Sequence, residues 1–500
     1  MRRRLLGSTI LVALLLAGCT AVGPDFVPPK APSALSWLTG KGRPAAPAKS
    51  APVEQPVDPN WWTLFNDPVL TSLEQRVAAG NLDLRAAEFR LSESRAQLGV
   101  AEAAQFPLSH ANASYTRTKA SNNGQFAVAS DALGANGASG STAGGISGTR
   151  RLNPFDVFQV GFDASWEIDL WGGVKRSVES ASALVEASAE ARRSILLSTL
   201  AEVARDYIAL RGVQTQLRIA RDSVKTARQS LSLTQQRAAG GVTTDLDVAT
   251  ASAQLRNTSA QIPRLEQQES AGINALSLLL GQPPNTLRDE LATAKPVPPV
   301  PPNVPVGIPS ELARRRPDIR QAEAQLHAAT ADIGVAIADF YPSVKISGSI
   351  GLQAVQFVRI FDFNSHMYSA GPGISIPLFE GGKLKATLHF REAAQQEAAI
   401  NYQKTVLNAW HEVDNALTAY TAEQARREQL RLAEADNRHA LGLAQSRYQQ
   451  GVADFLAVLD AERNLLATQL QLADSTTAIS SNLVALYKAL GGGWETNLPE

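Results

Sequence analysis

Four segments of the chain alternate between apolar and polar positions with a period of two residues. The clearest is 157–170, where even positions are mainly apolar and odd positions are polar or glycine. Residues 344–352 and 368–378 repeat this pattern, and residues 107–119 show it weakly. Strands of about ten residues with one apolar face are typical of transmembrane β-barrels, although a soluble sandwich with one wet face has the same pattern. Since four strands cannot close a barrel wide enough for solutes, strands that enter a membrane require several copies of the chain.

A long proline-free stretch follows each pair of predicted strands and predicts a helix. Residues 175–237 and 383–448 contain no proline, and a helix of that length extends about 95 Å, which is more than one globular domain can bury. The second stretch has apolar residues at coiled-coil spacing: Val406, Trp410, Val413, Leu417 and Tyr420. A glycine-containing turn and a returning helix of about 39 residues follow each long helix, at 242–280 and 452–490. We expect both turns at the end of the helices that is distant from the strands.

The two halves of the sequence resemble each other, which indicates an internal duplication. Residues 235–255 match residues 445–465 at an offset of 210, which aligns Arg237 with Arg447. Before the strands the offset is 235, and after them it is about 210, so the first half has about 26 extra residues between its Phe106-Pro107 and its Gly172-Gly173. These extra residues lie in the small, polar run 121–150, which cannot bury a core and predicts a flexible loop.

These patterns predict the organisation of the whole chain. In order, we expect a lipoprotein signal peptide (1–18), an extended lipid-anchored tether (19–60), a first repeat (61–291), a proline-rich linker (292–309) and a second repeat (310–500). Each repeat consists of a helix, a β-hairpin, a long helix, a turn and a return helix. The hairpins cover about 107–170 and 343–378, and the turns about 238–243 and 449–453.

The N-terminus has the features of an export signal. Three arginines precede an apolar run, 5–17, which is too short to span a bilayer. The run ends in Leu-Ala-Gly-Cys at Cys19, which resembles a bacterial lipobox whose cysteine is acylated; the alternative is an ordinary signal peptide with a chance cysteine. Thr20 is not the Asp that favours inner-membrane retention, so the outer membrane is permitted. Because Cys19 is the only cysteine, one copy has no disulfide and no thiolate metal site.

Composition and motifs argue against several other classes of protein. Basic and acidic residues balance at 47 each, so nothing suggests a nucleic-acid partner. The six histidines are scattered, and no H-E-x-x-H, G-x-S-x-G, P-loop or dinucleotide motif occurs. We therefore predict no enzyme, catalytic residue, cofactor or metal. Residues 314–316 are three arginines before Pro317, and we interpret them as solvated charges at a helix start in preference to an anion-binding patch.

Several motifs together resemble a known family, the TolC-like outer-membrane efflux factors, and in particular their NodT-type lipoprotein branch. The motifs that carry the resemblance extend over most of the mature chain: Leu16–Cys19, Gly23–Phe26, Trp61–Trp62, Phe65–Pro68, Arg315–Glu323, Asp339–Pro342 and Leu486–Trp494. The resemblance implies an α+β membrane channel built from an internally duplicated protomer. Three copies would combine their four transmembrane strands into one twelve-stranded β-barrel in the Gram-negative outer membrane, continued by a periplasmic α-helical barrel of long coiled-coil helices.

The resemblance also implies a function and partners. The protein would be the passive exit channel of a tripartite efflux pump for drugs or other small toxic compounds. Its partners would be two further copies of itself, a periplasmic adaptor protein, an inner-membrane proton-driven pump and outer-membrane lipid. Two alternatives remain open: a duct for ATP-driven protein secretion, and a periplasmic coiled-coil structural protein that forms no pore.

Two groups of residues receive a role from the resemblance. The turn residues would contact the adaptor, although they could be turn residues only: Gly241, Val242, Gly451 and Val452. Just after the second turn, one helix face would close the periplasmic end: Leu456, Asp460 and Arg463. Leu456 would form an apolar constriction and Asp460 a ring of three carboxylates, with Arg463 able to pair with an acid. The alternative is a solvated pair of charges, and the first repeat has Thr250 in place of Asp460.

Overall fold

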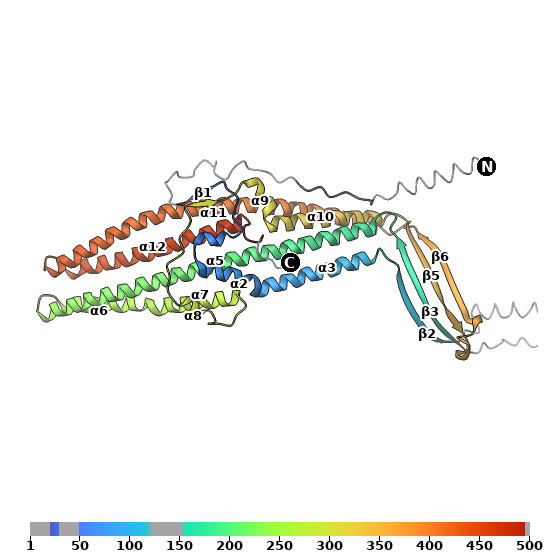
Figure 1. Ribbon diagram of the computed structural model, residues 1–500, viewed down its shortest axis with the longest axis horizontal. Helices are drawn as coiled ribbons and strands as arrows, with labels where there is room; N and C mark the ends of the chain where they lie inside the picture. The colour runs from blue at the N-terminus through green and yellow to red at the C-terminus, as the bar shows by residue number, and fades with distance from the viewer. Residues whose placement is uncertain (1–20, 30–49, 120, 122–153, 496–500) are drawn as a thin grey trace, which may run out of the picture. The chain divides into compact units, whose positions relative to one another are not determined.

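The computed structural model describes residues 21–29, 50–119, 121 and 154–495, and Figure 1 shows its ribbon. Its α-helices are α2 (Pro68–Gly80), α3 (Leu82–Ala103), α5 (Gly173–Ala239), α6 (Asp245–Ser259), α7 (Gln261–Leu279), α8 (Arg288–Leu291), α9 (Pro309–Arg315), α10 (Pro317–Ala338), α11 (Lys383–Gln449) and α12 (Phe455–Ala489). Its strands are β1 (Ala51–Val53), β2 (Leu108–Thr118), β3 (Phe155–Ile168), β4 (Asn303–Pro305), β5 (Ser343–Ala354) and β6 (His366–Ser375). Three short 3-10 helices are η1 (Trp61–Phe65), η2 (Phe357–Arg359) and η3 (Phe363–Ser365).

The chain divides into two compact units. The sheet unit comprises the described parts of 1–26, 96–182 and 328–395, and the helical unit comprises those of 27–95, 183–327 and 396–500. Both long helices, α5 and α11, contribute residues to both units. Cys19 and nearly all of the predicted loop 121–150 lie outside the described residues.

The sheet unit contains a four-stranded antiparallel sheet in the order β2-β3-β5-β6. Its register places apolar side chains in rows across the strands. Phe162 of β3 lies opposite Ile350 of β5, and Ile350 lies opposite Tyr368 of β6. The next row, on the other face, is polar: Asp163, Ser349 and Ser369. The two faces of the sheet therefore differ sharply in polarity, as the period-two pattern predicts.

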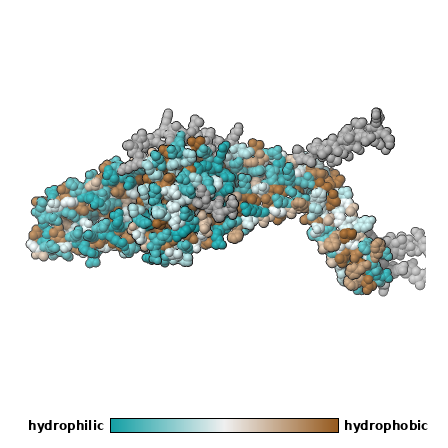
Figure 2. All heavy atoms as spheres, in the orientation of Figure 1, coloured by the Kyte–Doolittle hydropathy of each residue, from teal (hydrophilic) through white to brown (hydrophobic). Residues whose placement is uncertain are grey.

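No part of the chain that the structure describes covers the apolar face of the sheet. Phe162, Ile350 and Tyr368 are 64%, 63% and 86% exposed. In Figure 2, apolar residues gather over part of the sheet. The outer strands β2 and β6 each pair with one neighbour only among the described residues, so each leaves one edge of hydrogen-bonding groups unpaired.

The two long helices have 67 residues each, close to the predicted bounds. In α11 the apolar seam is Tyr402, Val406, Ala409, Val413, Leu417 and Tyr420, all buried. The predicted seam placed Trp410 where the structure has Ala409, and Trp410 is only half-buried. Ala409 lies three residues after Val406 and four before Val413, so it keeps the coiled-coil spacing with a side chain small enough for close helix approach.

Three predicted continuous helices are interrupted. The helix expected at the start of the first repeat breaks at Asn81, between α2 and α3. The helix expected at the start of the second repeat breaks at Arg316, whose extended backbone precedes Pro317. The first return helix breaks at Ala260, shortly before Pro263, whereas its counterpart α12 continues for 35 residues. Proline explains two of these breaks, because it lacks the amide hydrogen and restricts the preceding residue.

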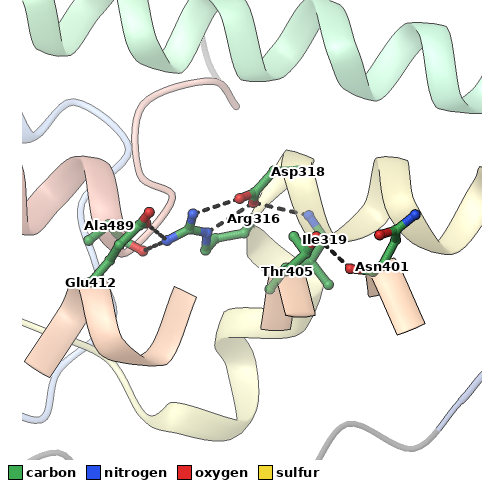
Figure 3. Close-up of polar contacts among 7 residues, drawn as sticks. All are labelled: Arg316, Asp318, Ile319, Asn401, Thr405, Glu412 and Ala489. Atoms are coloured by element: carbon green, nitrogen blue, oxygen red, sulfur yellow. Dashed lines mark hydrogen bonds and ion pairs between the residues drawn. The ribbon is translucent and has the colours of Figure 1, made fainter. Parts of the chain in front are cut away.

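The interruption at Arg316 corrects the prediction of solvated arginines. Arg316 is 7% exposed, and its guanidinium joins three helices of the helical unit (Figure 3). It donates to both carboxylate oxygens of Asp318 at 2.9 and 2.6 Å, to Glu412 of α11 at 2.7 Å and to the carbonyl of Ala489 in α12 at 2.9 Å. Buried charges need such partners, so this arginine is a structural tie and not an anion site. Arg315 also pairs with Glu495.

The interruption at Asn81 makes the corresponding contact in the first half. Asn81 is buried, and its side-chain nitrogen donates to the carbonyl of Leu279 at 2.8 Å. Under the sequence offsets of 235 and 210, Asn81 aligns with Arg316 and Leu279 aligns with Ala489. In each half, a side chain at the break in the first helix thus donates a hydrogen bond to a carbonyl at the end of the return helix.

Residues 50–60 of the predicted tether and the predicted linker 292–309 belong to the helical unit. β1 and β4 form a small parallel pair. Trp61 is fully buried, stacks on Tyr487 at 5.5 Å between ring centroids and donates to the carbonyl of Gly492 at 3.1 Å. Among the described residues, the structure contains no helix with the length and apolarity needed to cross a membrane.

Candidate functional site: paired helix turns and the N-terminal clamp

The two turns after the long helices have the same backbone geometry. Gly241 and Gly451 have φ values of +71° and +78°, a conformation that costs glycine little. The amide of Val242 bonds to the carbonyl of Arg237 at 2.9 Å, and that of Val452 to Arg447 at 3.0 Å. Both turns are therefore Schellman-type caps that end one helix and aim the chain into the next.

The side chains that follow the glycines are exposed. Val242 and Val452 are 65% and 61% exposed. The helices that follow begin with different caps: Thr244 forms a capping box with Asp247, whereas Asp454 accepts from the amide of Ala457 at 3.2 Å. The turns thus present apolar side chains on rigid backbone, which a partner protein could bury.

Arg237 joins the two turns to each other. Its Nη1 donates to the carbonyls of Tyr448 at 2.6 Å and Gln449 at 3.2 Å, at the end of α11. Its guanidinium also lies 4.6 Å from the centroid of the Tyr448 ring. A cation at the C-terminus of a helix is favourable because the last carbonyls are unpaired and carry partial negative charge. Nothing in the sequence around Arg237 indicates this role, and the only signal of it is that Arg447 repeats the arginine at the same place in the second half.

The three predicted gate residues lie on one exposed face of α12. Leu456 is 58% exposed, and Asp460 and Arg463 are also exposed. The Nε of Arg463 donates to the side-chain oxygen of Gln254 in α6 at 3.0 Å, so its recorded partner is a neutral amide and not an acid. Thr250, the counterpart of Asp460, donates to the carbonyl of Leu246 in its own helix.

A polar cavity of about 470 Å³ lies beside these residues, between the two helix pairs of the helical unit. Its lining includes Arg218, Asp222, Arg438 and Glu462. Glu462 is buried, and Ser230 of α5 donates a hydrogen bond to it. Burial raises the pKa of the Glu462 carboxyl above its usual value, and hydrogen bonds from Ser230 and Gln445 oppose that rise. No pattern in the sequence identified this carboxyl.

The sheet unit holds the residues that follow the predicted lipidation site. The carbonyl of Val22 accepts from the Nε of buried Arg176 at 3.1 Å, and the amide of Val22 donates to Trp171 at 2.9 Å. Arg176 also pairs with Asp25 at 2.7 Å. A Cβ on Gly334 would lie 2.9 Å from the Val22 carbonyl, so only glycine permits this approach. We call this arrangement the N-terminal clamp.

The chain is similar to known outer-membrane proteins in sequence and in fold. The sequence model of the outer membrane efflux protein family matches residues 73–282 and 308–492. The probable efflux pump outer membrane protein TtgC of Pseudomonas putida is 32% identical over 496 residues, covering 97% of this chain and 95% of TtgC. The probable outer membrane lipoprotein SilC of Salmonella typhimurium is 29% identical over 486 residues, covering 97% and 98%. The solved outer-membrane channel OprN superposes with a TM-score of 0.83 at 33% identity, covering 95% of this chain and 99% of OprN.

Proposed function

The chain belongs to the outer membrane efflux protein family, and we propose that it is the passive exit channel of a tripartite efflux pump. Its cargo would be drugs or other small toxic compounds. An inner-membrane proton-driven pump would supply the energy, and a periplasmic adaptor would join that pump to the channel. The names of TtgC and OprN, an efflux pump outer membrane protein and an outer-membrane channel, support this proposal.

The observation that carries the proposal is the uncovered apolar face of the sheet. Phe162, Ile350 and Tyr368 form one exposed row, while Asp163, Ser349 and Ser369 form the adjacent row on the opposite face. In water such a face would be unfavourable, at roughly 25 cal/mol for each Å² of apolar surface. Lipid outside and water inside a barrel would satisfy both faces.

The unpaired sheet edges support assembly of several copies of the chain. Edges of strands β2 and β6 would leave backbone groups unsatisfied in lipid, at several kcal/mol each. Pairing β2 of one copy with β6 of the next removes every edge. We propose that three copies close a twelve-stranded barrel, continued by a periplasmic barrel of the long helices.

Each protomer is proposed to be an internal duplication. The corresponding ties Asn81 to Leu279 and Arg316 to Ala489 support it. The two turns with equal backbone geometry and the two segments matched by the family model support it as well. A trimer of duplicated chains would have six similar helix pairs around the periplasmic opening.

The remaining sites follow from this assembly. Cys19 would carry the lipid, and the lipoprotein relative SilC supports this assignment. Leu456, Asp460 and Arg463 would face the periplasmic opening, with three Asp460 carboxylates favouring cations. Gly241, Val242, Gly451 and Val452 would contact the adaptor, since exposed valines at the turns offer apolar surface.

Planar-bilayer recording tests the proposed channel. The purified full chain should produce stepwise ionic conductance, because a closed barrel encloses water. Absence of conductance from protein that has inserted as an oligomer would favour the non-pore coiled-coil protein.

In-cell photocrosslinking tests the partners. Photoreactive residues beside Gly241 and Gly451 should capture the adaptor of a proton-driven pump, identified by mass spectrometry. Capture of an adaptor from an ATP-driven secretion system would instead assign the channel to protein export. Probes on the polar face of the sheet, at Ser349, serve as the control and should capture neither adaptor.

A further inference from the structure

Arg237 forms a cap between the two repeats of one chain. It extends from the end of α5 to the end of α11 and donates to the carbonyls of Tyr448 and Gln449. The same carbonyls terminate the helix, so their partial negative charge attracts the guanidinium. The first repeat therefore supplies an arginine to the second repeat.

The second repeat carries the same arginine without a recorded partner. Arg447 precedes its turn as Arg237 precedes the first turn, and the turn amides bond in the same way. Arg447 is exposed, and its side chain makes no hydrogen bond or ion pair within the described part of the chain. The acceptors that correspond to Tyr448 and Gln449 are the carbonyls of Ala238 and Ala239. In the described residues, no side chain donates to either carbonyl.

We infer that Arg447 caps the end of α5 in the neighbouring copy of the chain, donating to its Ala238 and Ala239 carbonyls. The inference rests on the proposed trimer of duplicated chains. In such a closed ring, first and second repeats alternate. The first repeat of a chain is followed by its own second repeat, and that second repeat is followed by the first repeat of the next chain. The contact between neighbouring repeats should therefore recur between chains. Each chain thus lacks one cap that only another copy supplies.

The contact between chains differs chemically from the contact within a chain. Within the chain, Arg237 lies over the ring of buried Tyr448, which packs at 5.6 Å against Phe455. At the corresponding positions the neighbour would offer Ala238 and exposed Asp245. Arg447 would therefore gain a nearby carboxylate but no ring. Exposed charge pairs are screened by salt, so this contact should weaken as ionic strength rises.

Cross-linking between two differently tagged chains tests the inference. One chain carries Arg447→Cys and the other carries Ala239→Cys, and a bifunctional thiosulfonate with the reach of an arginine side chain is added to co-expressed protein. We expect a covalent dimer that contains both tags, with none when either chain is expressed alone. Chains without substitutions control for the native cysteine.

The contact within the chain provides a matched control. Arg237→Cys and Gln449→Cys in one chain should cross-link internally, whereas the same substitutions on separate chains should give no dimer. Native mass spectrometry of the same samples reports the oligomer. Trimers without the Arg447→Cys to Ala239→Cys product would overturn this inference alone, while absence of trimers would overturn the proposed assembly.

A second measurement follows the energetic effect. Arg447→Ala trimers should dissociate in detergent roughly tenfold faster, the effect expected for loss of a charged hydrogen bond. Raised salt should reduce this difference, and Arg447→Lys should restore part of it. Dissociation at the unsubstituted rate in low salt would contradict the cap.

Discussion

The phenolic hydroxyl of Tyr207 in α5 donates a hydrogen bond to the Oδ2 of Asp67 at 2.7 Å. The other carboxylate oxygen of Asp67 accepts from the amides of Val69 at 2.8 Å and Leu70 at 3.3 Å. One carboxylate therefore caps α2 and satisfies a buried tyrosine. Burial, with the hydrogen bond to Asp67, raises the pKa of Tyr207, so the hydroxyl keeps its proton and remains a donor.

Asp67→Ala should lower the free energy of unfolding by about 2–4 kcal/mol, because it removes a helix cap and leaves the buried Tyr207 hydroxyl without an acceptor. Thermal unfolding followed by circular dichroism measures the change. Asp454→Ala is the matched control, since it removes a cap alone and should cost about 1 kcal/mol. Equal effects of the two substitutions would show that the Tyr207 bond adds nothing.

Glu462 should make the packing of α12 against α5 depend on pH. Its pKa is raised in the folded protein, so the folded state binds the proton more tightly than the unfolded state does. Stability is then highest below the unfolded pKa and falls as pH rises through the folded pKa. Glu462→Gln should remove this loss of stability, measured as unfolding midpoints at a series of pH values from pH 4, near the ordinary carboxyl pKa of about 4.3, upward.

Glu434 provides a control of opposite sign. Burial raises its pKa, but hydrogen bonds from Gln469 and Arg438 outweigh burial and the pKa is lowered. Its contribution is present above the unfolded pKa and is lost as pH falls through the folded pKa. Glu434→Gln should therefore remove a loss of stability that occurs at acid pH. If Glu434→Gln and Glu462→Gln had the same profile of stability against pH, the opposite pKa shifts of the two carboxyls would be contradicted.

Ile350→Lys should prevent assembly of the sheet in the outer membrane. A lysine on a lipid-facing position near the bilayer midplane costs about 2–4 kcal/mol. Ser349→Lys, one residue away on the opposite face, should assemble normally because it meets water. Membrane fractionation and heat-resistant trimers on gels report assembly. If both variants assembled equally well, the proposed placement of the sheet in the membrane would be contradicted.

Asp460→Asn should increase ionic conductance in planar bilayers, because Asp460 is proposed to belong to the gate that closes the periplasmic opening. It should also reduce cation preference, because a ring of three carboxylates becomes neutral. Thr250→Val alters the corresponding position of the first repeat and should leave both quantities unchanged. Unchanged conductance in Asp460→Asn trimers would count against a gate at this position.

Gly334→Ala should release the N-terminal clamp. The added methyl group would lie 2.7 Å from the Cγ of Arg176 and 2.9 Å from the Val22 carbonyl. Limited proteolysis within 21–29 should become faster. Gly99 aligns with Gly334, and a Cβ there would meet nothing within 4 Å, so Gly99→Ala should be neutral or stabilise α3 by up to about 1 kcal/mol. If both variants were cleaved at the same rate, the proposal that the clamp holds residues 21–29 would be contradicted.

Hydrophobic periodicity predicted the elements whose apolar faces are long and regular. The alternating strands and both 67-residue helices belong to this class, and the predicted glycine-containing turns follow both helices, with left-handed backbone at Gly241 and Gly451. The family, its membrane and its efflux role also followed from motifs that the comparisons match.

Contacts between distant segments explain what the sequence did not predict. The break at Asn81 depends on the Leu279 carbonyl, 198 residues away, and local propensity does not register such a partner. Arg316 is in a run of three arginines, which suggested solvent, yet Glu412 and Asp318 neutralise it in the interior. Arg237, Arg176 and Glu462 likewise acquire their surroundings only when separate helices meet.

The N-terminal clamp would determine which residues bear a force applied through the proposed lipid anchor. Cys19 and Val22 are three residues apart, so at about 3.5 Å per residue the lipid would be attached within about 10 Å of Val22. Tension on the acyl chains would reach the fold through Val22 and Asp25, and buried Arg176 would resist it. The anchor would be a short attachment to the sheet unit. It would keep the lipid at a fixed height relative to the strands of that unit.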